Sequence, residues 1–317
     1  MGVDDFVTAL SEYAERAPQP ALIPIIEGLR RPVTVGVVGR PGVGRRTVTA
    51  ALRAAGVPVV AARPDVDALV IAETAKPEDC RTAARTSRPL LTVLNKADLL
   101  GAAAADRVTR IRRLTGAPTV PMSALHAVAT LDAAQVAALR VLAADPADLS
   151  STDAFCAGPH GLDAGTRAGL LAALDLSGIA VLTSAIRSGA DGPSLTTRLR
   201  RLSNVEEVCA GLHMVAAGHR YRRLRLALAR AGALAARTGD QRLAALLAAD
   251  TAVFAAMGAA TEVLEADGLM VRSGDPLQQA VQWHRYSRGP VGALHRRCGA
   301  DVARGALRSL SGGGDRP

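Results

Sequence analysis

Residues Gly39 to Gly44 form a glycine-rich turn whose composition suits phosphate binding. The turn follows the apolar run VTVGVV and precedes a segment of helical character. Backbone N–H groups in such a turn, together with the positive end of the following helix, can hold phosphate oxygens. A tight glycine turn between a strand and a helix also occurs for purely structural reasons, so both interpretations stay open at this point. The candidate phosphate contacts are Gly39, Arg40, Pro41, Gly42, Val43, Gly44, Arg45, Arg46 and Thr47.

Two further polar motifs follow predicted strands later in the chain. Asn95-Lys96-Ala97-Asp98 comes directly after the apolar run LLTVL, and Ser123-Ala124-Leu125 follows the next predicted strand. In this order the three motifs resemble those of the GTPases, over roughly residues 32–144. The resemblance implies that Asp98 accepts hydrogen bonds from the guanine ring, that Asn95 contacts the base edge and that the Lys96 stem covers the base plane. It also implies that a backbone N–H of the segment Ser123, Ala124 and Leu125 meets the guanine O6.

The phosphate-binding part departs from the GTPase pattern G-x-x-x-x-G-K-[ST] at two positions. Arg45 stands where the family has a lysine, and Arg46 stands where it has a Ser or Thr that ligates Mg²⁺. Arginine has no lone pair to offer a cation, and Thr47 lies about 100° further round the helix. We therefore expect GTP or GDP as the ligand, with Mg²⁺ poorly held.

A second departure lies between the first helix and the strand that follows it. GTPases place a switch threonine and a D-x-x-G motif there, whereas this chain has about ten residues after Gly56 before the strand near Ala68, and no D-x-x-G. That length has no room for a switch loop and two more strands. Asp65, which follows Pro64, is interpreted as a turn residue and not as a metal ligand.

The first half of the chain alternates strand-like and helix-like segments. Its strand-like runs are apolar on both faces, which is typical of parallel strands covered by helices. We therefore predict a doubly wound α/β sheet of the P-loop GTPase type. The predicted strands are Val33–Gly39, Val57–Val60, Ala68–Glu73, Leu90–Asn95 and Thr119–Met122, and the predicted helices lie near Thr47–Ala55, Pro77–Thr86, Ala102–Leu114 and Leu131–Ala144.

Beyond about Asp145 the strand signals fade and helical periodicity dominates. The spacing of apolar residues on both sides of Thr238-Gly239-Asp240 predicts two helices joined there. Leu174 to Leu212 resembles the segment that follows the GTPase domain in bacterial, mainly actinobacterial, dynamin-like proteins, and Gln282 to Leu310 is similar to their closing region. This resemblance implies a stalk-like helical bundle that pairs with a second family member and sometimes touches membrane. An unrelated Ala- and Arg-rich bundle would give similar strings.

The composition limits the partners that we expect. The formal net charge is +9, and residues 218–317 hold fifteen Arg against eight Asp or Glu. Aromatic residues make up only 2% of the chain, and the four cysteines show no C-x-x-C pair, so sequence-specific nucleic acid binding and zinc binding are not supported. No secretion signal or long uninterrupted apolar stretch is apparent. We expect a cytoplasmic protein, with peripheral contact to an anionic inner membrane surface as an open alternative.

Together these features predict four parts: an N-terminal helical segment 1–31 that joins the bundle, a reduced GTPase-like domain 32–145, a helical bundle 146–310 and a disordered tail 311–317. The expected function is that of a degenerate dynamin-like GTPase homologue, a pseudo-GTPase without catalytic residues, that binds guanine nucleotide with little hydrolysis. It would act through its helices on a protein partner, for which an intact dynamin-like GTPase is one candidate, or on a membrane surface. The alternatives are a nucleotide-free scaffold and an active GTPase of low turnover.

Overall fold

The computed structural model describes residues 2–17, 19–271 and 274–312 and divides into two compact units. Residues 34–212 form one unit, here called the sheet unit, and residues 1–33 with 213–317 form the other, called the helical unit. The boundary expected near residue 145 lies inside the sheet unit, while the N-terminal segment groups with the last hundred residues. Of the expected disordered tail, residues 313–317 lie outside the described residues, and residues 311 and 312 end the last helix.

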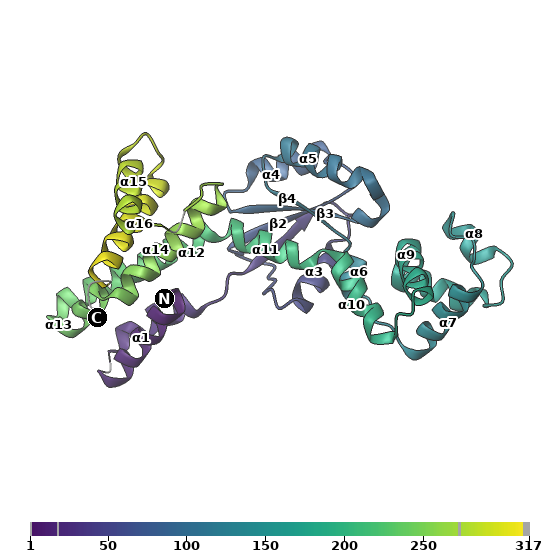
Figure 1. Cartoon of the computed structure of the whole chain (residues 1–317), viewed down its shortest axis with the longest axis horizontal. Coiled ribbons are helices and arrows are strands. Elements are labelled where there is room, and N and C mark those ends of the chain that lie inside the picture. Colours follow the sequence, from purple (N-terminus) through teal and green to yellow (C-terminus); the bar gives the residue numbers. More distant parts are fainter. Residues whose placement is uncertain (1, 18, 272–273, 313–317) are drawn as a thin grey trace. The chain divides into compact units, whose positions relative to one another are not determined.

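A four-stranded parallel sheet forms the centre of the sheet unit (Figure 1). Its strands pair in the order β1-β2-β3-β4, which is also their order in the chain. The inner strands β2 and β3 are buried along almost their whole length, as the apolar runs predicted. The strands are β1 (Val35–Gly39), β2 (Val66–Ala72), β3 (Leu90–Asn95) and β4 (Thr119–Met122).

The fifth strand predicted at Val57–Val60 is wrong. Only Val59 pairs with the sheet, in an isolated parallel bridge to Val35. Two backbone hydrogen bonds flank that bridge, from Val35 N to the carbonyl of Pro58 and from Val60 N to the carbonyl of Val35. Pro58 has no N–H to donate, so a regular ladder cannot extend through it.

Helices lie along both faces of the sheet (Figure 1). Figure 1 shows α4 and α5 on one face and α3 and α11 on the other, where a Cβ at Gly211 of α11 would lie 3.1 Å from the Leu91 side chain. Leu69, Ile71, Leu94 and Ile111 form a fully buried core cluster, against which Ala83 of α4 and Val108 of α5 pack. The elements are α3 (Arg45–Ala54), α4 (Pro77–Arg85), the 3-10 helix η2 (Ala97–Ala103), α5 (Ala104–Thr115), α6 (Ala124–Val128) and α11 (Val205–Val215).

Four more helices complete the sheet unit around a second apolar core. They are α7 (Ala133–Ala144), α8 (Thr152–Ala157), α9 (Ala164–Arg187) and α10 (Gly192–Ser203). Phe155, Leu170, Leu182 and Leu199 are buried in this core. Helix α9 bends at Asp175, whose backbone is not helical (φ 58°, ψ 171°).

Helix α9 is, among the described residues, long and apolar enough to cross a membrane by length and composition. The pair α13 and α14, bent by 44°, passes the same test as one broken span. Within the sheet unit, the bend at Asp175 interrupts α9, and Leu174 and Ile179 on either side of it are buried in the second core.

The described part of the helical unit consists of helices packed around an alanine-rich core. Small side chains let the helices approach closely: a Cβ at Gly305 of α16 would lie 2.3 Å from the Met257 sulfur of α14. Phe6, Tyr221 and Trp283 are buried in the same core. The helices are α1 (Val3–Arg16), the 3-10 helix η1 (Pro20–Leu22), α2 (Ile23–Arg30), α12 (Ala217–Thr238), α13 (Gln241–Ala248), α14 (Asp250–Ala266), α15 (Pro276–Arg288) and α16 (Ala293–Gly312).

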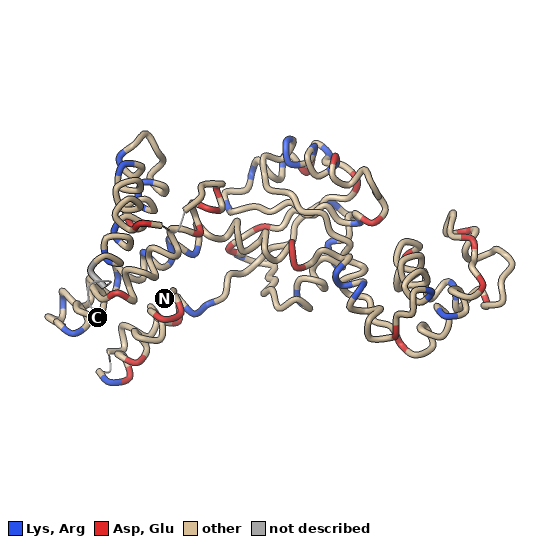
Figure 2. The backbone as a smooth tube through the Cα atoms, in the orientation of Figure 1, with Lys and Arg blue, Asp and Glu red and all other residues tan. Residues whose placement is uncertain are grey.

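Charged residues of both signs are scattered along the helical unit (Figure 2). Several of its arginines form ion pairs, such as Arg220 with Glu262 at 2.5 Å and Arg308 with Asp250 at 2.5 Å. Part of the basic excess of this region is therefore neutralised within the unit. The coarse prediction, a parallel α/β sheet followed by a helical region, is confirmed.

Candidate functional site

The three sequence motifs meet at the carboxyl ends of β1, β3 and β4. Asn95, the last residue of β3, is 3% exposed, and its side-chain amide links the other two motifs. Its Nδ2 donates to the carbonyl of Val43 in the glycine turn at 2.9 Å, and its Oδ1 accepts from the N–H of Ala124 at 3.1 Å. One amide thus satisfies a donor and an acceptor on two separate loops.

The segment after Asn95 brings Asp98 to the same edge of the sheet. Lys96 has a left-handed backbone (φ 59°) and turns the chain into η2, while its side chain is exposed. The N–H of Asp98 donates to the Ser123 hydroxyl at 3.1 Å, which ties this segment to the loop after β4. Leu125 is half-buried in α6. The backbone of Asp98 is therefore held against the loop that carries the third motif.

The glycine turn approaches its neighbours more closely than a side chain would allow. Gly44 has φ 90°, and a Cβ there would lie 2.3 Å from Nδ2 of Asn95. Gly39, with φ 146°, would place a Cβ 2.5 Å from the carbonyl oxygen of Val70. Pro41 and Gly42 are exposed at the tip of the turn.

Helix α3 starts directly after the turn, and its first residues are Arg45, Arg46 and Thr47. Both arginines are exposed, and Thr47 is half-buried. No side chain among the described residues caps the first N–H groups of α3, whereas Asp132 caps the start of α7. Free N–H groups and two cations at a helix N-terminus favour an anion over a cation.

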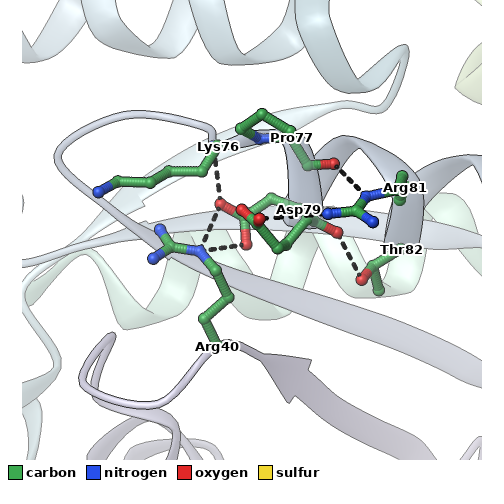
Figure 3. Close-up of polar contacts among 7 residues, drawn as sticks. Arg40, Lys76, Pro77, Asp79, Arg81 and Thr82 are labelled. Atoms are coloured by element: carbon green, nitrogen blue, oxygen red, sulfur yellow. Dashed lines mark hydrogen bonds and ion pairs between the residues drawn. The ribbon is translucent and has the colours of Figure 1, made fainter.

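Arg40 forms an ion pair with a buried carboxylate on α4 (Figure 3). Its Nε lies 3.0 Å from both oxygens of Asp79, whose side chain is 1% exposed. Asp79 also accepts the N–H of Lys76 at 2.9 Å, so it closes the first turn of α4. The hydrogen bond to Asp79 raises the pKa of Arg40, so the guanidinium group stays charged.

These residues do not fit a magnesium site. Arg46 has no lone pair, and the carboxylate of Asp79 is already neutralised by Arg40. Asp65 and Asp67 lie at the amino end of β2, where Asp65 accepts from Thr34 at 2.9 Å and Asp67 pairs with Arg88 at 3.0 Å. Across the described ranges, no group of three or more His, Cys, Asp or Glu residues is placed to hold a metal ion.

Two residues that the motifs did not point to lie next to this site: Ser177 contacts Asp98, and His126 contacts Ser177. The hydroxyl of Ser177, two residues after the bend in α9, donates to Oδ2 of Asp98 at 2.7 Å. The same hydroxyl lies 3.3 Å from Nε2 of His126 on α6. His126 is buried, and its Nδ1 has no hydrogen-bond partner among the described residues. Neither side chain belongs to a periodic or spaced pattern, so the linear sequence held no signal for this contact.

The arrangement combines a helix start without a side-chain cap and a half-buried carboxylate that accepts a hydrogen bond from Ser177. No protein-family model, curated protein or solved structure matches this chain.

Proposed function

We propose that this chain is a degenerate relative of the dynamin-like GTPases that binds guanine nucleotide and hydrolyses it little. The observation that carries the proposal is the convergence of the glycine turn, Asn95 and Asp98 at one edge of the sheet, where the Asn95 amide joins the carbonyl of Val43 to the N–H of Ala124. A loop that could hold phosphate and a carboxylate that could read a base thus lie at the same edge of one parallel sheet.

The phosphate end would use backbone N–H groups and arginine charge. The first turn of α3 offers uncapped N–H groups, and the exposed guanidinium groups of Arg45 and Arg46 supply positive charge beside them. Because the residues do not fit Mg²⁺, the charge that builds up during phosphoryl transfer has only these arginines to stabilise it. We therefore expect binding without brisk hydrolysis.

The base end would use Asp98. A guanine presents two adjacent N–H donors on one edge, and an ionised carboxylate accepts two hydrogen bonds side by side. An adenine presents an acceptor at one of those positions and so leaves part of the carboxylate unpaired, which costs affinity. Selectivity for guanine over adenine is thus the expected signature of the site.

The helices of the chain would carry the response to a partner. The resemblance to dynamin-like proteins supports a protein partner, for which an intact dynamin-like GTPase is one candidate, or an anionic membrane surface. The exposed arginines of α15 and α16 that have no ion pair in the described structure, such as Arg285 and Arg304, would favour an acidic surface.

Calorimetric titration of the full-length chain with GDP, GTP, ADP and ATP, each with Mg²⁺ and with a chelator, tests the proposal. We expect guanine nucleotides to bind more tightly than adenine nucleotides, with little change in chelator. The variant Asp98→Asn should weaken guanine and favour xanthine nucleotides, because an amide NH₂ complements the additional carbonyl of xanthine. Asp106→Asn, at an exposed position of α5, is the matched control. Equal affinity for ADP and GDP would contradict the proposal.

A nucleotide-free scaffold is the second candidate, and one contact favours it. Ser177 already donates to Asp98, so the carboxylate is partly satisfied without a ligand. Thermal unfolding separates the two: a nucleotide at about 100 times its dissociation constant should stabilise the fold by about 2.7 kcal/mol. A scaffold would unfold at the same temperature with and without nucleotide.

A further inference from the structure

The bend of α9 lies against the carboxylate of Asp98, to which the proposed function assigns the recognition of the base. Asp175 adopts φ 58° and ψ 171°, a backbone conformation that is strained for any residue but glycine. Its side chain accepts the N–H of Leu176 at 2.7 Å, which begins the second part of the helix. Such backbone strain persists only where the surrounding contacts hold it.

The bend is held by the apolar core that buries Leu174 and Ile179 and by polar contacts from the candidate site. Ser177 donates to Oδ2 of Asp98 at 2.7 Å and lies 3.3 Å from Nε2 of His126. Gly178 comes so close that a Cβ there would be 3.1 Å from Nε2 of His126 and 3.1 Å from the Cβ of Leu174. The segment 174–178 is therefore packed against η2 and α6 at the position where the motifs converge.

The two carboxylate oxygens of Asp98 differ in their hydrogen bonding. Oδ2 accepts from Ser177, while Oδ1 forms no hydrogen bond with the described residues. A guanine edge needs both oxygens in one plane. A base N–H that reaches Oδ2 would therefore share this oxygen with the Ser177 hydroxyl, which lies 2.7 Å from it and crowds the approach of the base.

We propose that residues 174–178 form an internal cap on the base pocket and that Ser177 competes with guanine for Asp98. This inference rests on the proposed function. When a base pairs with Asp98, the hydroxyl is displaced, the contact with His126 is lost and the strained bend is released from the pocket. Nucleotide binding is thereby coupled to the conformation of α9 and its apolar core.

The test compares Ser177→Ala with the wild-type chain and with Ser184→Ala, an exposed serine further along α9. Alanine removes the competing hydroxyl without adding bulk. We expect Ser177→Ala to bind GDP about tenfold more tightly, the size of one lost competing hydrogen bond. Ser184→Ala should bind like the wild type.

Hydrogen exchange without nucleotide gives the second measurement. Amides of residues 174–180 should exchange about tenfold faster in Ser177→Ala, because the tether to Asp98 is missing, and should respond in the same direction when GDP is added to the wild type. Ser184→Ala should leave their exchange unchanged.

The outcomes separate the cap from the proposed function. Binding seen only in Ser177→Ala would support the cap in its strongest form. Equal affinity of the two chains, weaker binding by Ser177→Ala, or unchanged exchange would overturn the cap and leave guanine binding standing. Faster exchange with no nucleotide bound by either chain would overturn both, and Asp98 would then be only a tether of the bend.

Discussion

In the sheet unit the polar side chains gather at the carboxyl ends of β1, β3 and β4, whereas in the helical unit they lie between helices as separate pairs. The sheet supplies the difference, because parallel strands bring distant loops to one edge. Asn95 joins two loops there, and Asp98 and His126 each keep a polar atom without a partner among the described residues. Spare acceptors and donors at one place are what a ligand needs.

Several polar groups of the helical unit are instead paired with one another. The hydroxyl of Tyr221 donates to Oδ2 of Asp301 at 2.7 Å. His295 lies between Tyr286 and Asp267, at 2.6 Å from each, and so links α16 to α15 and to the end of α14. Such pairs fix how helices pack but leave little capacity for a ligand. The comparison predicts that substitutions in the two units will differ in kind as well as in size.

The largest effect is expected at Gly44. Alanine there would have φ 90° and a Cβ 2.3 Å from Nδ2 of Asn95, which cannot move without losing both of its hydrogen bonds. We expect Gly44→Ala to destabilise the sheet unit by about 3 kcal/mol or more, measured by thermal or urea unfolding. Gly42→Ala has a similar φ of 85° with open space around it, so about 1 kcal/mol is expected. Equal effects would show that Asn95 does not hold the turn.

The next effect concerns Arg40 and Asp79. Arg40→Met leaves a buried carboxylate with only the N–H of Lys76, while Asp79→Asn removes the charge and keeps the shape. Removing one partner of an ion pair costs more stability when the charge that remains is buried than when it is exposed to solvent. Since Arg40 is 25% exposed and partly screened, we expect about 2 kcal/mol for Arg40→Met and about 1 kcal/mol for Asp79→Asn. Arg81→Met, which removes an exposed pair with Glu78, should cost less than about 0.5 kcal/mol. The reverse order in urea unfolding would argue against an ionic pair.

A smaller effect is expected in the helical unit at Tyr221. Tyr221→Phe removes the hydroxyl and leaves the buried carboxylate of Asp301 to Arg225 alone, at 3.4 Å. Burial, followed by the bond to Asp301, raises the pKa of Tyr221, so the hydroxyl stays protonated and donates throughout the neutral range. We expect a loss of about 1–2 kcal/mol in thermal unfolding with no change in nucleotide affinity. A change in affinity would show that the two units are coupled.

The smallest effect is a pH dependence at Asp240. Hydrogen bonds from Tyr13, Leu243 and Gln19 lower the pKa of Asp240. A carboxyl whose pKa is lower in the folded state stabilises the fold above its unfolded value of about 3.9, and the stabilisation is lost as the pH falls through the folded value. Acid titration of the helical signal should show this loss below about pH 4, and Asp240→Asn should flatten it. An unchanged profile in the variant would assign the loss to other carboxyl groups.

The sequence predicted the regular elements better than the contacts between them. The runs at Leu90–Asn95 and Thr119–Met122 are strands with the predicted bounds, and Gly239 ends α12 with φ 66° as its turn motif indicated. Val57–Val60 failed because Pro58 removes a donor from the ladder. These outcomes depend on the local chemistry of each segment, which can be read directly from the sequence.

The candidate site could be predicted from the sequence only in part. Each motif ends a strand, and strands of one parallel sheet bring their carboxyl ends together, so proximity of Gly44, Asn95 and Ser123 could be expected. Ser177 on Asp98 and Asp79 on Arg40 depend on how α9 and α4 pack, and packing leaves no mark in residue spacing. Tertiary partners of polar groups are therefore the part that the sequence does not reveal.

The dual hydrogen bonding of Asn95 has a consequence for how related chains should be judged. An amide that staples two loops keeps its usefulness even where no ligand is ever bound, because losing it would loosen the turn at Gly44. The Asn of such a motif can thus be retained for its structural role after nucleotide binding has been lost. Lys96, whose exposed side chain forms no such link in the described structure, is better evidence for a retained base site than Asn95.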